Sequence, residues 1–106
     1  MSIKLISSNE KLQQCNLSID EELTIYVALS YKAELANYLV TYHLFCVDLS
    51  LIEEVDSAGI QLLLAFRNKV KGLGHCVLYQ NPSEVCKTIF QRYGLTVTEL
   101  CCRDQN

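Results

Sequence analysis

The sequence predicts an α/β fold in which a mixed β-sheet packs against helices. Three amphipathic helical segments alternate with short apolar runs, and this alternation implies crossover connections between strands of one sheet. Half of the 106 residues are apolar, a fifth are charged, and there is one proline with four glycines. This composition is typical of a globular chain that is large enough to bury its own core. Residues 1–106 are therefore expected to form a single domain.

Five short segments are candidate strands, so we expect a sheet of four to five strands. The segment 44–49 is almost continuously apolar, as is typical of a central strand covered on both faces. The candidate strands span residues 3–7, 13–19, 44–49, 76–79 and 96–101.

The first and third helices are predicted over residues 25–42 and 82–93. Thr24 is the expected N-cap of the first helix. Asn81 is the expected N-cap of the third, with Pro82 at its first position and Gly94 at its end. The apolar face of the first helix carries Ala28, Tyr31, Leu35, Leu39 and Tyr42.

The second helix is predicted from Ser57 to about residue 73, with Asp56 as its N-cap. Its core face carries Gly59, Leu62, Leu63, Phe66, Val70 and Leu73. Ile60 and Leu64 fall with Ser57 and Gln61 on the opposite side, which we expect to face water. Exposed aliphatic side chains of this kind either mark a surface that docks a partner, are covered by another loop or helix, or are stray surface residues. Periodicity leaves these three readings open.

Ser57 has a local environment that permits phosphorylation. Its hydroxyl lies among unpaired backbone N–H groups at the positive end of the helix dipole, where an anion is tolerated. A phosphate would add a charge of about −1.5 to −2 near Glu53, Glu54 and Asp56. That charge would leave the fold intact and would disfavour a docked partner through repulsion and desolvation. A simple helix start explains the same serine without a switch.

Composition and motifs argue against several other classes of protein. A formal charge of −3 disfavours a surface for nucleic acid or anionic membranes. No apolar run is long enough to cross a membrane, and no signal-peptide core is present, so we expect a cytoplasmic protein with free thiols. No metal-ligand spacing is found, and no cofactor is expected. His43 and His75 lack a sequence context for catalysis, so an enzyme is not expected.

The run VDLSLIEEVDSAGIQLLL, residues 47–64, resembles the signature of STAS domains, the family of anti-sigma factor antagonists. The residues around Glu22-Leu23-Thr24, Asn81-Pro82-Ser83 and Tyr93-Gly94-Leu95 are similar to the family in the same order, so that the resemblance covers about residues 13–100. It implies a bacterial, non-enzymatic module with a mixed sheet and helices mainly on one face.

The resemblance also implies how such a module works. It binds a serine-kinase anti-sigma factor or a related regulator of transcription while Ser57 is unphosphorylated, and it releases this partner when Ser57 is phosphorylated. A PP2C-type phosphatase then resets it. The residues that the resemblance assigns to partner binding are Thr24, Asp56, Ser57, Ile60, Gln61 and Leu64.

Two other functions stay open. Some proteins that resemble this chain are constitutive accessory subunits of a lipid-transport ABC ATPase complex, and others sense small ligands or nucleotides. The chain departs from the family at Glu21, which stands where the family has a turn glycine. A left-handed backbone is unfavourable for glutamate, so a remodelled loop is expected there.

Overall fold

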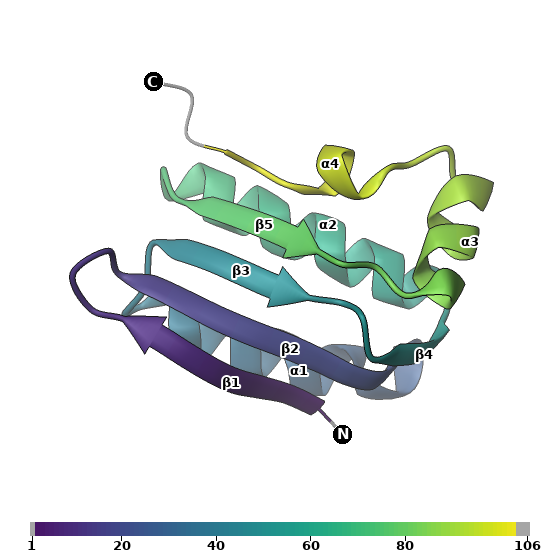
Figure 1. Ribbon diagram of the computed structural model, residues 1–106, viewed down its shortest axis with the longest axis horizontal. Coiled ribbons are helices and arrows are strands. Elements are labelled where there is room, and N and C mark those ends of the chain that lie inside the picture. The colour runs from purple at the N-terminus through teal and green to yellow at the C-terminus, as the bar shows by residue number, and fades with distance from the viewer. Residues whose placement is uncertain (1, 104–106) are drawn as a thin grey trace.

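Within residues 2–103, the part of the chain that this computed structural model describes, five strands form one mixed sheet and four helices pack around it (Figure 1). The strands are β1 (Ser2–Asn9), β2 (Gln14–Leu23), β3 (Leu44–Asp48), β4 (Ile52–Val55) and β5 (Cys76–Gln80). The helices are α1 (Ile25–Leu39), α2 (Ser57–Gly72), α3 (Glu84–Arg92) and α4 (Val97–Leu100). The predicted α/β fold with a mixed sheet is confirmed.

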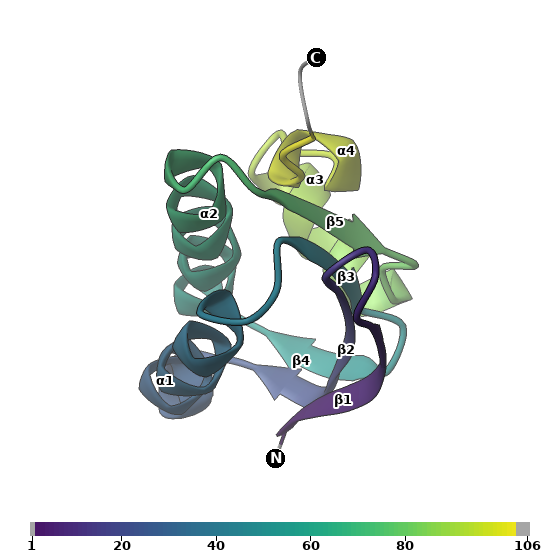
Figure 2. The same cartoon turned by 90° about the vertical axis from the view of Figure 1, so that its left-hand side faces the viewer.

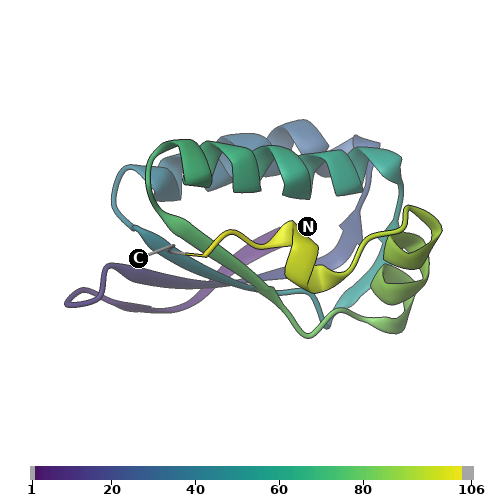
Figure 3. The ribbon, with the colours of Figure 1, turned by 90° about the horizontal axis from the view of Figure 1, so that it is seen from above.

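Strand β2 pairs with three other strands of the sheet. It pairs with β1 in antiparallel fashion and with β3 in parallel, and β5 pairs in parallel with the far side of β3. The last residues of β2 pair in parallel with β4, a short strand that the sequence analysis missed. Because β2, β3 and β5 run in the same direction, α1 and α2 both begin at the end of the sheet where these parallel strands finish (Figures 1 and 3).

Helices α1 and α2 lie side by side on one face of the sheet (Figures 2 and 3). Every second strand residue points toward them and is buried, as the pleat of a strand requires. The buried apolar residues at these alternating positions of β2, β3 and β5 are Cys15, Leu17, Ile19, Phe45, Val47, Val77 and Tyr79. Phe45 meets Phe66 of α2 edge to face, with 5.4 Å between the ring centroids. This layer is the core of the protein.

The expectation that both faces of the 44–49 strand are covered is wrong. Phe45 and Val47 are buried, whereas Leu44, Cys46 and Asp48 on the opposite face are half-buried. No helix among residues 2–103 crosses that face, because α3 packs against β4 at the end of the sheet and α4 lies along β5. A continuous apolar run can thus belong to a strand with one open face.

The C-terminal part of the chain also differs from the sequence-based expectation. Residues 96–101 were expected to be a strand, but Thr96 caps α4 and forms a reciprocal pair with Glu99. Its hydroxyl accepts a hydrogen bond from the Glu99 N–H at 3.3 Å, and its own N–H donates to the Glu99 carboxylate at 3.1 Å. The capping box stabilises a helical turn here, despite the preference of the β-branched residues in this segment for a strand. Cys102 then forms one isolated bridge with Val77.

Two helix boundaries shift for local reasons. Ser83 rather than Asn81 caps α3, since its hydroxyl accepts from the Cys86 N–H at 3.2 Å. Asn81 instead has a left-handed backbone with φ of 52°. Helix α1 ends at Leu39, before the predicted residue 42.

No helix among residues 2–103 combines the length and apolarity that a membrane span requires. In the same described residues, no three histidine, cysteine, aspartate or glutamate side chains gather as a metal site. All six cysteines are free thiols.

Candidate functional site

The carboxylate of Asp56 holds the N-termini of α1 and α2 together. One oxygen, Oδ1, accepts a hydrogen bond from the Gly59 N–H at 3.1 Å and so caps α2, as predicted. The other oxygen, Oδ2, accepts from the N–H of Ile25, the first residue of α1, at 3.0 Å. The Asp56 N–H donates to the Leu23 carbonyl at 3.2 Å. Two positive helix ends, each with unpaired N–H groups, therefore meet at one carboxylate.

Gly59 allows this close approach of α2 to the end of β2. A Cβ atom built on Gly59 would lie 2.0 Å from the carbonyl oxygen of Leu23, a distance at which backbone atoms would have to move. Glycine is thus required three residues after Asp56 because of packing and not because of its torsion angles. The Asp-Ser-Ala-Gly segment thus connects the N-termini of α1 and α2 with the end of β2.

Ser57 is the first residue of α2, and its side chain is exposed. Glu53 and Glu54 on the preceding strand β4 are exposed as well. Ser57 therefore lies, as predicted, at an accessible helix N-terminus, and acidic residues precede it in the chain.

The expectation that Ile60 faces outward is wrong. Ile60 is only 1% exposed and belongs to the hydrophobic core. It shares its side of α2 with Leu64, Arg67 and Lys71, which follow at helical spacing, and Arg67 on this side donates a hydrogen bond to the Glu99 carbonyl of α4. Ile60 is therefore covered by other parts of this chain, one of the three readings that periodicity left open. Leu64 on the same side is half-buried.

Thr24 is also buried, with 2% of its surface exposed. It occupies the N-cap position of α1, but its side chain makes no capping hydrogen bond. Its hydroxyl donates instead to the carboxylate of Glu22. Neither Thr24 nor Ile60 can therefore contact a docked partner through its side chain. Of the residues expected to bind a partner, Ser57 and Gln61 are exposed and Asp56 and Leu64 are half-buried.

Helix α1 has an exposed apolar surface that was not predicted from the sequence. Ile25, Tyr26 and Leu29 in its first turns are large apolar side chains that are 65%, 88% and 82% exposed. At about 100° per residue they fall within one arc of the helix. The same arc carries the exposed residues Ala33, Ala36 and Val40.

Helix α1 therefore has two apolar faces. One contains Tyr31 and Leu35 and lies in the core, and the other points away from the sheet. A polar arc that includes Ser30 and Asn37 separates the two. The sequence signal for this second face is a set of apolar residues that fall on one arc of the helical wheel, outside the core face.

The exposed face of α1 adjoins Ser57. The hydrogen bond from Ile25 to Asp56 brings the start of α1 against the residue that precedes Ser57. We call the exposed residues at these two helix starts the entry surface; it consists of Ile25, Tyr26, Leu29, Ser57 and Gln61.

A groove continues the entry surface between the two helices. It has a volume of about 350 Å³ and is lined by apolar side chains of both helices, including Leu39 and Phe66. Lys32 and Lys69 also line it and supply its positive charge. Such a groove suits apolar side chains that are accompanied by acidic ones.

Comparison with known proteins identifies the fold. The family model described as "Mlab, STAS domain" matches residues 6–100. Among solved structures, the unphosphorylated form of the anti-sigma factor antagonist SpoIIAA superposes with a TM-score of 0.73 at 17% identity, over 89% of this chain and 82% of that chain.

Two further structures are similar. The phosphorylated form of SpoIIAA from Bacillus gives a TM-score of 0.69 at 17% identity, over 89% of this chain and 85% of that chain. A sulfate transporter family protein from Wolinella succinogenes gives 0.68 at 19% identity, over 83% of this chain and 72% of that chain. Identities this low establish a common fold. No curated protein matches the chain.

Proposed function

Because this chain belongs to the STAS domain family, we propose that it is a non-enzymatic module that docks a regulatory protein and releases it when Ser57 is phosphorylated. The observation that supports the proposal is the entry surface, where large exposed apolar side chains of α1 adjoin the exposed Ser57. Single exposed apolar residues are common, but Ile25, Tyr26 and Leu29 lie on one helix face and form a patch.

The proposed partner is a serine-kinase anti-sigma factor or a related regulator, with a PP2C-type phosphatase to reverse the modification. The likeness to SpoIIAA supports this choice, since SpoIIAA is an anti-sigma factor antagonist with an unphosphorylated and a phosphorylated form. The kinase active site of such a partner must reach Ser57, and the exposure of Ser57 at a helix start is compatible with that reach.

Phosphorylation would act on the interface and not on the fold. In the unmodified protein, docking removes Ile25, Tyr26 and Leu29 from water, which favours association. A phosphate on Ser57 would bring a charge of about −1.5 to −2 to the edge of this apolar patch. A docked partner would then desolvate an anion that already neighbours Glu53, Glu54 and Asp56, and the complex would weaken.

The test is a binding measurement with a purified serine-kinase partner and four variants. Ser57→Asp should weaken binding by about tenfold or more, which is about 1.4 kcal/mol, and Ser57→Ala should bind like the wild type. Asn68→Asp is the matched control, because it adds the same charge to an exposed position of α2; it should change the affinity by less than about twofold.

Leu29→Glu tests the docking surface separately from the switch. It should abolish measurable binding, because it places a carboxylate in the centre of the apolar patch. If Leu29→Glu binds like the wild type, the entry surface is not the interface. If Ser57→Asp and Asn68→Asp behave alike, Ser57 is not the switch.

A second function is favoured by one observation. The exposed apolar arc of α1 continues beyond the entry surface to Val40, and permanent interfaces are more hydrophobic than transient ones. This extent suits a constitutive accessory subunit of a lipid-transport ABC ATPase complex. In that case Leu29→Glu should prevent co-purification of the ATPase subunit, while Ser57→Asp and Ser57→Ala should both retain it.

A further inference from the structure

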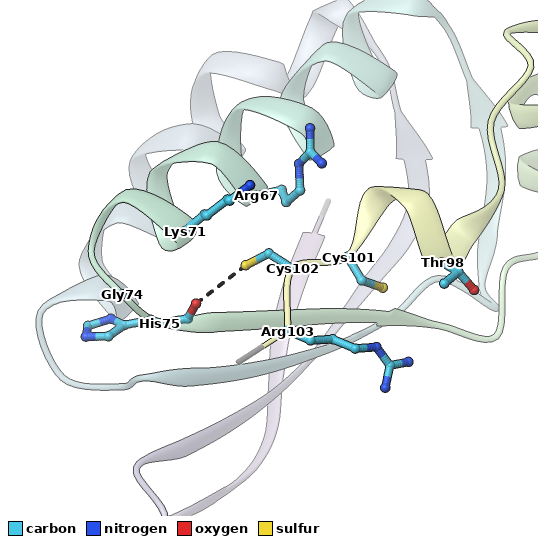
Figure 4. Close-up of a pocket in the computed structure, with 8 residues that line it drawn as sticks. All are labelled: Arg67, Lys71, Gly74, His75, Thr98, Cys101, Cys102 and Arg103. Carbon is cyan, nitrogen blue, oxygen red and sulfur yellow. Dashed lines mark hydrogen bonds between the residues drawn. The ribbon is translucent and has the colours of Figure 1, made fainter. Parts of the chain in front are cut away.

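A basic cavity lies toward the other end of α2, away from the entry surface. It has a volume of about 520 Å³ and lies between the C-terminal half of α2, helix α4 and the segment that follows α4 (Figure 4). Arg67 and Lys71 line it from α2, and Thr98, Cys101, Cys102 and Arg103 line it from the C-terminal part. Arg67 follows Ser57 by ten residues, which corresponds to about 15 Å along a helix. The cavity and the entry surface are therefore separate.

The lining of this cavity is positively charged. Among residues 2–103, Arg67, Lys71 and Arg103 line it and no acidic side chain does, in a chain whose formal charge is −3. The guanidinium of Arg103 points away from Arg67 and Lys71, so these two form the basic cluster (Figure 4). Arg67 and Lys71 are four residues apart on one helix face, a spacing at which like charges repel. The negative end of the helix dipole favours Lys71 in the last turn of α2, but Arg67 lies a full turn earlier.

The nearest acidic residue on α4 does not neutralise these charges. The Glu99 carboxylate accepts hydrogen bonds from the N–H and the hydroxyl of Thr96. Glu99 offers Arg67 only its backbone carbonyl, which accepts from Nη1 at 3.4 Å.

Arg67 also has a donor without an acceptor. Its Nε is buried and makes no hydrogen bond within the described residues. A buried donor that lacks a partner is unfavourable, especially when it carries charge. Nε itself is shielded from solvent, so an acceptor in the cavity that Arg67 lines would be held by the terminal Nη atoms of the guanidinium.

Nδ1 of His75 is likewise buried and unpaired in the described part of the chain. The His75 ring stacks on His43, however, and points away from Arg67 and Lys71 (Figure 4). Its ring is therefore not part of the basic cluster.

We propose that this cavity binds an anion of the phosphate type. The planar guanidinium of Arg67 can hold two phosphate oxygens through a fork of N–H donors, and Lys71 supplies a point charge. Thr98 on α4 also lines the cavity. A volume of about 520 Å³ lies in the range of pockets for small organic ligands, so the phosphate belongs to an organic molecule, either a soluble phosphate ester or the headgroup of a lipid.

The test is an NMR titration of the full chain with three probes. These are inorganic phosphate, glycerol 3-phosphate and a short-chain phosphatidic acid kept below its micelle concentration. Saturable shifts are expected at the backbone amides of Arg67, Lys71 and Thr98. Tighter binding of the phosphatidic acid indicates a lipid headgroup, and tighter binding of glycerol 3-phosphate indicates a soluble ester.

Two variants decide whether the cavity itself is responsible. Arg67→Gln should weaken binding by about tenfold or more, because the fork of donors is lost. Lys69→Gln is the matched control: it removes the same charge from α2, on the side that faces α1, and should change the affinity by less than about twofold. The thermal midpoint of Arg67→Gln, measured without ligand, shows whether the variant is folded.

The proposal is wrong if none of the three probes gives saturable shifts. It is also wrong if Arg67→Gln and Lys69→Gln weaken binding equally, since binding would then reflect the general charge of the surface. If Arg67→Gln does not fold, Lys71→Gln replaces it with the same expected loss.

Discussion

Oδ2 of Asp56 lies 3.0 Å from the backbone nitrogen of Ile25, so the carboxylate that caps α2 also holds the first residue of α1. The two helices are otherwise joined through side-chain packing along their length. This hydrogen bond fixes the relative position of their first turns. It therefore determines where the exposed side chain of Ile25 stands relative to Ser57.

Replacing Asp56 should destabilise the protein through both helices. Asp56→Ala removes an N-cap, which costs about 1 kcal/mol, and leaves the Ile25 N–H without its acceptor, which costs about 1 kcal/mol more. The free energy of unfolding, measured in urea, should fall by about 2 kcal/mol. Glu53→Ala, at an exposed position nearby, is the control and should change it by less than about 0.5 kcal/mol. Equal effects of the two variants would contradict the dual role of Asp56.

The close contact at Gly59 predicts a large penalty for the smallest possible side chain. Gly59→Ala places a Cβ atom 2.0 Å from the Leu23 carbonyl oxygen, so α2 must move away from β2. We expect a loss of about 3 kcal/mol or more in the free energy of unfolding. Gly72→Ala is a matched control, because a Cβ atom at residue 72 would meet no atom within 4 Å. It should be neutral or stabilise α2 by up to about 1 kcal/mol. A similar outcome for both glycines would refute the steric argument.

Glu21 offers a stabilising substitution. The expected remodelling of its loop does not occur: Glu21 has a left-handed backbone, with φ of 66°, at a bulge in β2. Its N–H donates to the Leu51 carbonyl at 3.1 Å, and glycine would keep that hydrogen bond. Glu21→Gly should therefore raise the free energy of unfolding by about 1 kcal/mol, since glycine adopts this conformation without strain.

The control for this prediction is Glu53→Gly. Glu53 lies in β4 and is not among the residues with a positive φ. Glycine there should lower the stability by about 0.5–1 kcal/mol, because it only adds freedom to the unfolded chain. A loss of stability in Glu21→Gly would show that the interactions of the Glu21 side chain stabilise the protein by more than its left-handed backbone costs.

His75 should make the stability of the protein depend on pH. Partial burial, followed by the charge of His43, lowers the pKa of His75 from its ordinary value of 6.5. The unfolded chain therefore takes up a proton at a higher pH than the folded protein does. Stability is fully present above the unfolded pKa and falls as the pH drops below about 6.5 toward the lower folded value.

His75→Gln should flatten this part of the stability profile. Urea unfolding at a series of pH values between about 7 and 5 would show the difference, since this range contains the ordinary pKa of histidine. The wild type should lose stability more steeply than the variant. Parallel profiles would mean that His75 does not contribute to the dependence.

Local interactions explain which expectations from the sequence are confirmed. Asp56 caps α2 through the Gly59 N–H, three residues away, and Ser57 is the first residue of that helix. Such features depend on neighbours within a few residues, so the sequence reveals them directly. The exposure of Ser57 follows in the same way from its place in the first turn of a capped helix.

The features that were not predicted, or were predicted wrongly, depend on contacts between segments that are distant in the sequence. A helical wheel predicts that Ile60 is exposed, but only 1% of its surface is exposed in the folded protein. Strand β4 exists because it pairs with the end of β2, about thirty residues earlier in the chain. Residues 96–101 have the composition of a strand, but α4 forms there, and after α4 Cys102 forms one isolated bridge with Val77 of β5.

The sequence by itself determined the elements that periodicity and capping specify: the α/β class, the start of α2 and an accessible Ser57. Only the tertiary structure decided which apolar side chains remain exposed. Ile60, which was expected on the surface beside Ser57, is buried, whereas Tyr26 and Leu29 are exposed. The physical reason is that burial depends on what packs against a face. A helix with two apolar faces can bury only one of them against a single sheet, and the sequence of that helix does not state which one.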